Sequence, residues 1–233
     1  MLRRLAPPDM QPAGFAFNAD NAEWAKKEIA KYPQGRQASA VIALLWRGQE
    51  QDGWVTHPMI ESIAQMLSMP FIRVLEVATF YTMFNLVPVG TYLVQVCTTS
   101  PCWLAGSDAV VDACKKHIHP AQRTVSADGK FSWMEVECLG ACVNAPMLQI
   151  DKDFYEDLDG PITEKLLEDF RAGRTVKPGP QNSRHTSEPL GGATTLHDPS
   201  LYDGSIIGRQ KRAPVVTDAD GKTTTPKTPG AAT

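Results

Sequence analysis

Two short stretches decide the fold and point to the chemistry of this chain: Cys97-Thr-Thr-Ser-Pro-Cys102 and Cys138-Leu-Gly-Ala-Cys142. They hold four of the five cysteines, and 35 residues lie between them. Thiolates are soft ligands that select zinc or iron–sulfur clusters. A [2Fe–2S] cluster needs two thiolates on each of its two irons, and a structural zinc site needs four thiolates that often come in pairs. The spacing therefore indicates a metal centre and leaves the metal open.

Each cysteine pair follows directly on a predicted strand. In chain order, the hydrophobic pattern predicts a strand over 92–96, a helix over 107–118, strands over 131–137, 147–150 and 154–158, and a helix over 163–170 capped by Thr163. This order is compatible with a thioredoxin-like α/β sheet that has helices on both faces. If the first two strands are parallel, both cysteine loops lie at one edge of the sheet, where open α/β folds hold ligands.

The N-terminal third predicts a small helical bundle. Helices are expected from Asp20, the predicted N-cap, to Pro33, over 36–51, from Thr56 to Leu67 and over 71–82, each with an apolar stripe. The last two resemble a helix-turn-helix, but residues 71–82 carry one Arg and one Glu and no other charge. A helix that reads the major groove needs more polar and basic side chains, and the net charge of −3 also argues against a nucleic-acid partner.

Composition divides the chain into four predicted parts: an N-terminal extension (1–17), a helical domain (18–88), a thioredoxin-like domain with the cysteine pairs (89–176) and a mostly disordered tail (177–233). Gly, Pro and Thr fill 23 of the 57 tail positions, so the tail has no periodic apolar face to bury. The longest apolar run, Ala40–Trp46, is far shorter than the roughly 18–20 residues of a membrane-spanning helix. The basic N-terminus lacks the apolar region of a signal peptide, and we expect a soluble chain.

The residues around the cysteines resemble a known family. Asp128-Gly-Lys-Phe-Ser132 and the run from Cys138 to Pro146 resemble the signature of the small [2Fe–2S] subunit (NuoE type) of respiratory NADH:quinone oxidoreductase, complex I. Cys97-Thr-Thr, Cys102 and Gly106 are similar to its first pair, and Gly35-Arg-Gln37, Gly53-Trp54 and Val77–Tyr81 to its helical region. The resemblance covers roughly residues 15 to 175, and the tail lies outside it.

This resemblance implies a specific role. Cys97, Cys102, Cys138 and Cys142 would bind one [2Fe–2S] cluster and would be the metal ligands. A larger partner subunit would bind NADH and FMN, and this chain would exchange one electron with that FMN. It would have no catalytic residues and no complete active site of its own, in agreement with the lack of a Gly-x-Gly-x-x-Gly or Walker motif in the sequence.

The resemblance also implies partners and a location. The chain would form a heterodimer with the flavin- and NADH-binding subunit, contact further subunits of the peripheral arm, and lie at the cytoplasmic face of the bacterial inner membrane or on the matrix side of mitochondria. Part of the interface is expected among seven apolar and aromatic residues of the helical domain: Trp24, Trp46, Trp54, Phe71, Phe80, Tyr81 and Phe84.

Alternatives remain open. Related subunits occur in NAD-linked hydrogenases and formate dehydrogenases, so the signature identifies the module better than the complex. A zinc-stapled interaction module would use the same four cysteines. A dithiol redox protein is a weaker alternative because neither pair has the C-x-x-C spacing. The fifth cysteine, Cys114, is expected to be a small buried residue of the 107–118 helix and not a ligand.

Overall fold

The computed structural model describes residues 3–182, 184, 187, 191, 195, 198, 216–217 and 223–224. The chain divides into two compact units, Met1–Thr186 and Ser187–Thr233. In the second unit, the described strands β6 (Val216–Thr217) and β7 (Thr223–Thr224) pair antiparallel. The rest of the prediction of a disordered tail lies largely outside the described residues. None of the helices in the described ranges is long and apolar enough to cross a membrane.

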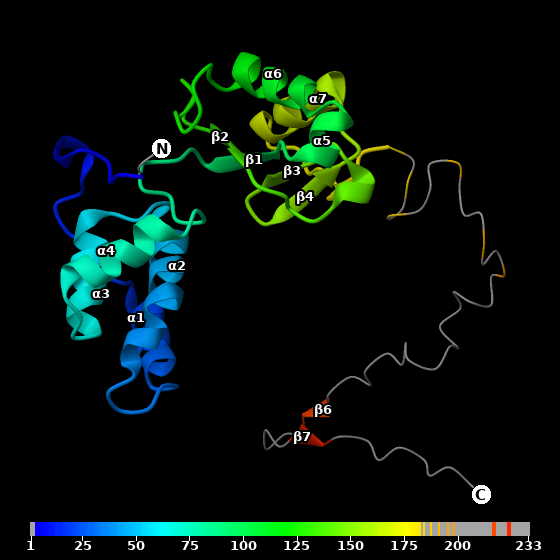
Figure 1. The fold of residues 1–233 in the computed structure, drawn as a ribbon. Coiled ribbons are helices and arrows are strands. Elements are labelled where there is room, and N and C mark those ends of the chain that lie inside the picture. Colours follow the sequence, from blue (N-terminus) through cyan, green and yellow to red (C-terminus); the bar gives the residue numbers. More distant parts are fainter. Residues whose placement is uncertain are drawn as a thin grey trace, which may run out of the picture. The chain divides into compact units, whose positions relative to one another are not determined.

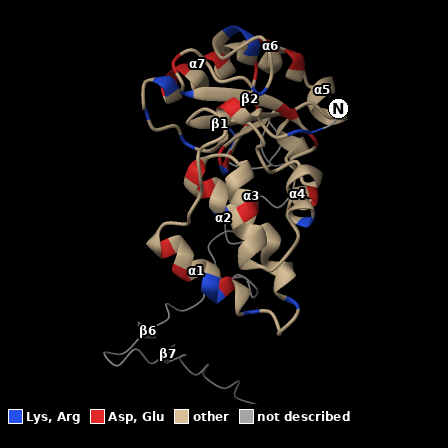
Figure 2. Ribbon diagram, turned by 90° about the vertical axis from the view of Figure 1, so that its left-hand side faces the viewer, with Lys and Arg blue, Asp and Glu red and all other residues tan. Residues whose placement is uncertain are grey.

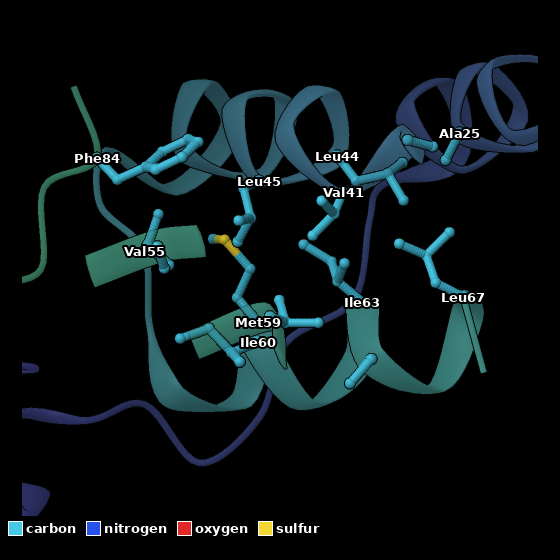
Figure 3. Packing of buried hydrophobic residues seen from close by; sticks show 14 of the residues in the cluster. Ala25, Val41, Leu44, Leu45, Val55, Met59, Ile60, Ile63, Leu67 and Phe84 are labelled. Carbon is cyan, nitrogen blue, oxygen red and sulfur yellow. The ribbon is translucent and has the colours of Figure 1, made fainter. Parts of the chain in front are cut away.

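The first unit begins with the predicted helical region. Its elements are η1 (Pro8–Met10), α1 (Ala19–Ile29), η2 (Gln37–Ala40), α2 (Val41–Asp52), α3 (His57–Met66) and α4 (Phe71–Phe80) (Figure 1). Leu45 of α2 points toward Met59 of α3 (Figure 3), and Leu44, Leu45, Ile60 and Ile63 are all fully buried in one cluster. Gly48 allows this close packing, because a Cβ there would lie 2.6 Å from the sulfur of Met59. The apolar stripes of the sequence therefore form one bundle core.

The starts of the first and last helices differ from the prediction because of their caps, and the helix predicted over 36–51 begins as the 3-10 turn η2 before α2 starts at Val41. Asn18, and not Asp20, caps α1, since its side chain accepts a hydrogen bond from the Asn21 backbone N–H. The last helix begins earlier than Thr163, because Asp159 accepts from the Ile162 N–H and Pro161 fits the first turn. In both helices, a residue a few positions before the predicted cap accepts the hydrogen bond from the first turn.

The thioredoxin-like part follows the bundle. Its elements are β1 (Tyr92–Cys97), α5 (Ser100–Leu104), α6 (Ser107–His117), β2 (Phe131–Val136), η3 (Cys142–Asn144), β3 (Leu148–Ile150), β4 (Asp153–Glu156), α7 (Gly160–Arg171) and β5 (Gly179–Pro180). The strands form one sheet in the order β2-β1-β3-β4-β5. β1 and β2 are parallel and place Cys97 beside Val136. The cysteine loops thus leave the same edge of the sheet, as expected.

The two long helices cover one face of this sheet, which corrects the expectation of helices on both faces. Figure 1 shows α6 and α7 side by side on the sheet, and residues of both share one core cluster with Val94 and Val96 of β1. On the opposite face, Gln95 of β1 pairs with Gln149 of β3. Polar residues at these alternating positions would be costly to bury under a helix without partners, so the strands themselves favour a one-sided arrangement.

Charged residues of both signs are interspersed along α6 and α7 (Figure 2). Lys116 of α6 and Glu164 of α7 form an ion pair with an N–O distance of 2.8 Å. Such an exposed, solvent-screened pair adds little to stability, so the buried apolar cluster beneath it holds these helices on the sheet.

Gly90 allows the chain to enter β1 against the backbone of β2. A Cβ at this position would lie 2.5 Å from the carbonyl carbon of Phe131, which is backbone and cannot move aside cheaply. We expect Gly90→Ala to lower the free energy of unfolding by about 1–3 kcal/mol, as overpacking does. Gly14→Ala is the matched control, because nothing lies within 4 Å of a Cβ there. Urea denaturation of both variants checks this, and equal midpoints would contradict it.

Candidate metal centre

The first cysteine pair joins the end of β1 to the short helix α5. Cys97 is the last residue of β1, and Cys102 lies within α5, so the predicted loop is partly helical. Both side chains are only 1% exposed. Thr99 occupies the N-cap position of α5 without capping it, and its hydroxyl oxygen lies 3.3 Å from the Cys97 sulfur. The turn therefore points a hydrogen-bonding group at the first sulfur.

The second pair lies on the loop that follows β2. The sulfur atoms of Cys138 and Cys142 are 3.4 Å apart, and both residues are exposed. Gly140 between them has a φ of +86°, which L side chains rarely adopt. The loop ends in η3 and a cis Ala145–Pro146 peptide bond. A left-handed glycine thus turns the chain back so that the two thiols meet.

The two pairs adjoin each other. Cys97 and Cys102 form a small buried cluster with Met147, and Leu139, Ala141 and Ala145 of the second loop pack against it, together with Phe154 of β4. The backbone of Leu139 also hydrogen-bonds the Cys97 sulfur. The second loop therefore lies on the first pair, and all four sequence-predicted cysteines come together at one edge of the sheet.

Burial and mutual contact set the protonation of these thiols. Burial raises the pKa of Cys97, but hydrogen bonds from the side chain and backbone of Thr99 and from the backbone of Leu139 outweigh it and lower the pKa below its usual value. Burial, and then the adjacent Cys97, raise the pKa of Cys102 to about 12. The hydrogen bond with Cys138 raises the pKa of Cys142. Cys102 and Cys142 thus favour the protonated thiol, and a metal ion that binds them must displace those protons.

The donor set fits a centre of two metal ions. The described residues contain no group of three or more His, Cys, Asp or Glu side chains that would hold a single ion. They do contain two adjoining thiol pairs, each with its two side chains in contact. One pair for each of two irons is the ligand arrangement of a [2Fe–2S] cluster.

Cys114 has a different environment from the other four cysteines. It lies in α6, is fully buried in the core beneath the helices, and packs in the same cluster as Val110. Burial raises its pKa to about 12. As expected, it is a small core residue.

Three residues of the site were not predicted from the sequence. Thr99 and the Leu139 N–H, which hydrogen-bond Cys97, and Met147 beneath the first pair were not identified. The position of Thr99, two residues after Cys97, could have predicted a hydrogen bond between its hydroxyl and the cysteine sulfur. The contacts of Leu139 and Met147 depend on how the second loop folds over the first, which no local pattern records.

Comparisons with known proteins agree with this geometry. Residues 25–171 match the family model of the thioredoxin-like [2Fe-2S] ferredoxins. The chain is 56% identical over 215 residues to an NADH-quinone oxidoreductase E-type subunit of Rhizobium meliloti, covering 91% of this chain and 78% of that protein. It is 50% identical over 157 residues to the E-type subunit of Rickettsia typhi, covering 67% of this chain and 92% of that protein.

Among solved structures, the fold resembles a chain of an NAD+-reducing [NiFe]-hydrogenase in its H2-reduced state. The TM-score is 0.52 at 19% sequence identity, and the match covers 59% of this chain and 23% of that chain. At this identity the likeness concerns the fold alone. The family match over residues 25–171 confirms the predicted thioredoxin-like domain.

The five cysteines should separate into two classes. Serine at Cys102 or Cys138 removes a soft ligand, so we expect loss or strong alteration of the bound metal's absorption spectrum and less metal per chain. Cys114→Ser is the matched control. It should leave the spectrum and metal content unchanged and cost ~1 kcal/mol or more of stability through a poorly paired hydroxyl. Bleaching by Cys114→Ser but not by Cys102→Ser would refute the ligand assignment.

Proposed function

Because the chain belongs to the thioredoxin-like [2Fe–2S] ferredoxins, and among them to the E-type subunits of the NADH-quinone oxidoreductases, we propose that Cys97, Cys102, Cys138 and Cys142 bind its [2Fe–2S] cluster. Cys97 and Cys102 serve one iron, and Cys138 and Cys142 serve the other. The observation that carries this assignment is the meeting of two thiol pairs at one sheet edge. When bound, such a cluster accepts and returns one electron.

The chain's own residues prepare this site for electron transfer. The Thr99 and Leu139 hydrogen bonds to the Cys97 sulfur stabilise negative charge on that ligand, and hydrogen bonds to sulfur are one of the factors that set a cluster's potential. The first pair is buried, whereas Cys138 and Cys142 are exposed. A redox partner would therefore approach the cluster on the side of the second pair, which Cys138 and Cys142 would hold.

The redox partner is a separate subunit that binds NADH and FMN. A hydride carries two electrons, and a single one-electron centre cannot accept it, so a flavin must stand between NADH and this chain. The exposed apolar residues of α4 and the turn after it form part of the proposed interface: Phe80 is 76% exposed, Ile72 54% and Tyr81 39%. Of the seven residues expected there, Phe84 is fully buried and belongs to the core.

The complex is an NADH:quinone oxidoreductase, and this chain lies in its peripheral arm beside further subunits, at the cytoplasmic face of the inner membrane. The two bacterial relatives described above, at 50–56% identity, supply the support. The same module in an NAD-linked hydrogenase or formate dehydrogenase is the nearest alternative. A zinc-stapled interaction module is the other alternative, and metal analysis separates it from the proposal.

The purified chain should contain two irons and two acid-labile sulfides. After reduction by one electron it should give a spin-half EPR signal, because the two irons couple to leave one unpaired electron. Anaerobic preparation with iron and sulfide analysis, followed by EPR, checks this. Stoichiometric zinc with no iron would support the interaction-module alternative and end the electron-transfer proposal.

Activity toward NADH should depend on the flavin-bearing subunit. The isolated chain should neither bind NADH nor oxidise it. Mixed with that subunit, it should form a stable heterodimer that reduces artificial acceptors with NADH. Titration of the isolated chain is decisive, since binding in the micromolar range, or turnover, would make this a self-contained oxidoreductase.

A charged residue on α4 tests the proposed interface within the same experiment. Phe80→Glu should weaken heterodimer formation at least tenfold without bleaching the cluster, because the carboxylate would be desolvated against an apolar surface. Met10→Glu is the comparison variant, since Met10 is 49% exposed but lies in η1 and not on α4. Equal affinities of both variants and the unaltered chain would exclude α4 from the interface.

A further inference from the structure

The segment after α7 returns to the edge of the sheet. Gly179 and Pro180 form β5, which pairs in parallel with Tyr155 and Glu156 of β4. The N–H of Gln181 donates to the Glu156 carbonyl at 3.0 Å. These bonds carry the chain past residue 176, where the sequence analysis placed the end of the domain, and along the strand that leads to Asp157.

Arg184 ends this segment in a buried ion pair. Its Nη2 lies 2.9 Å from Oδ1 of Asp157, and the two side chains are only 15% and 6% exposed. Its Nη1 donates to the Val143 carbonyl at 3.3 Å and to Oδ1 of Asn144 at 3.4 Å. Val143 and Asn144 directly follow Cys142 in η3. One guanidinium thus joins the strand edge to the loop of the second cysteine pair.

Further bonds fix the same loop to the same edge. The Asp157 N–H donates to the Asn144 carbonyl at 2.8 Å, and the Asn144 side-chain amide donates to Oε2 of Glu156 at 2.6 Å. Asp157 has a φ of +54°, a conformation that Asp adopts more readily than most residues. It can therefore turn its N–H toward η3 while its carboxylate faces Arg184.

We propose that Arg184 is a positioning residue for Cys142. This inference rests on the proposed role of Cys142 as a cluster ligand. The Arg184 guanidinium and Asp157 hold η3 in place, and η3 begins at Cys142. Cys142 is exposed, so few neighbouring side chains fix its position. The contacts of Arg184 and Asp157 with η3 therefore position the Cys142 sulfur. A buried Asp left without its cation is strongly unfavourable, so removal of Arg184 drives this edge to rearrange.

Arg184→Gln in the full-length, cluster-loaded chain is the main test. This substitution removes the positive charge and the planar guanidinium group. Loss of the cluster to an iron chelator should become at least threefold faster, and the EPR g-values of the reduced protein should shift. Arg184→Lys keeps the charge without the planar group and should recover part of both properties. Arg174→Gln is the matched control. Arg174 follows α7, is 58% exposed and pairs with Asp169 of that helix, away from η3, so its loss should change neither property.

Identical release rates and g-values in Arg184→Gln and Arg174→Gln would overturn the positioning role of Arg184. Amide hydrogen exchange of Asn144 and Asp157 gives a readout that does not need the cluster. Faster exchange in Arg184→Gln supports the positioning role of Arg184 whichever metal is bound. If the chain binds zinc, the proposed electron-transfer function is wrong, but the positioning role of Arg184 is still supported. Unchanged exchange would overturn this role whichever metal is bound. Asp157→Asn tolerates the same φ and should reproduce the faster exchange if Arg184→Gln does not fold.

Discussion

The parallel pairing of β1 with β2 is the constraint on which the rest of the structure depends. Parallel neighbours place the ends of both strands at one edge, so the loops that follow Cys97 and Val136 leave the sheet side by side. α6 provides the crossover that parallel strands require. An antiparallel pairing of the same two strands would send the cysteine pairs to opposite edges, and no shared metal centre could form.

The two pairs are not equivalent in their surroundings. Cys97 and Cys102 are buried against Met147, and the hydroxyl of Thr99 faces one of their sulfurs. Cys138 and Cys142 are exposed and depend on the turn at Gly140 and on the tethering of η3. A covered half and an accessible half suit a centre that must stay bound while it exchanges electrons with another protein.

Much of this arrangement could be predicted from the sequence because neighbouring residues determine it. The strands that lead into the two cysteine pairs, β1 and β2, alternate or run apolar, and Thr56 caps its helix with its own side chain. The contacts of Arg184 could not be predicted, because they join a Gly- and Pro-rich segment to residues about 30–40 positions earlier. The one-sided sheet was missed although Gln95 and Gln149 signalled it, since their pairing becomes visible only with the register.

X-ray absorption at the iron and zinc edges of the oxidised, full-length chain tests the central claim most directly. If the two thiol pairs hold a [2Fe–2S] cluster, each iron will have sulfur neighbours from cysteine and bridging sulfide, together with a short iron–iron scattering path. An iron or zinc ion surrounded by four cysteine sulfurs, with no metal–metal path, would contradict the account.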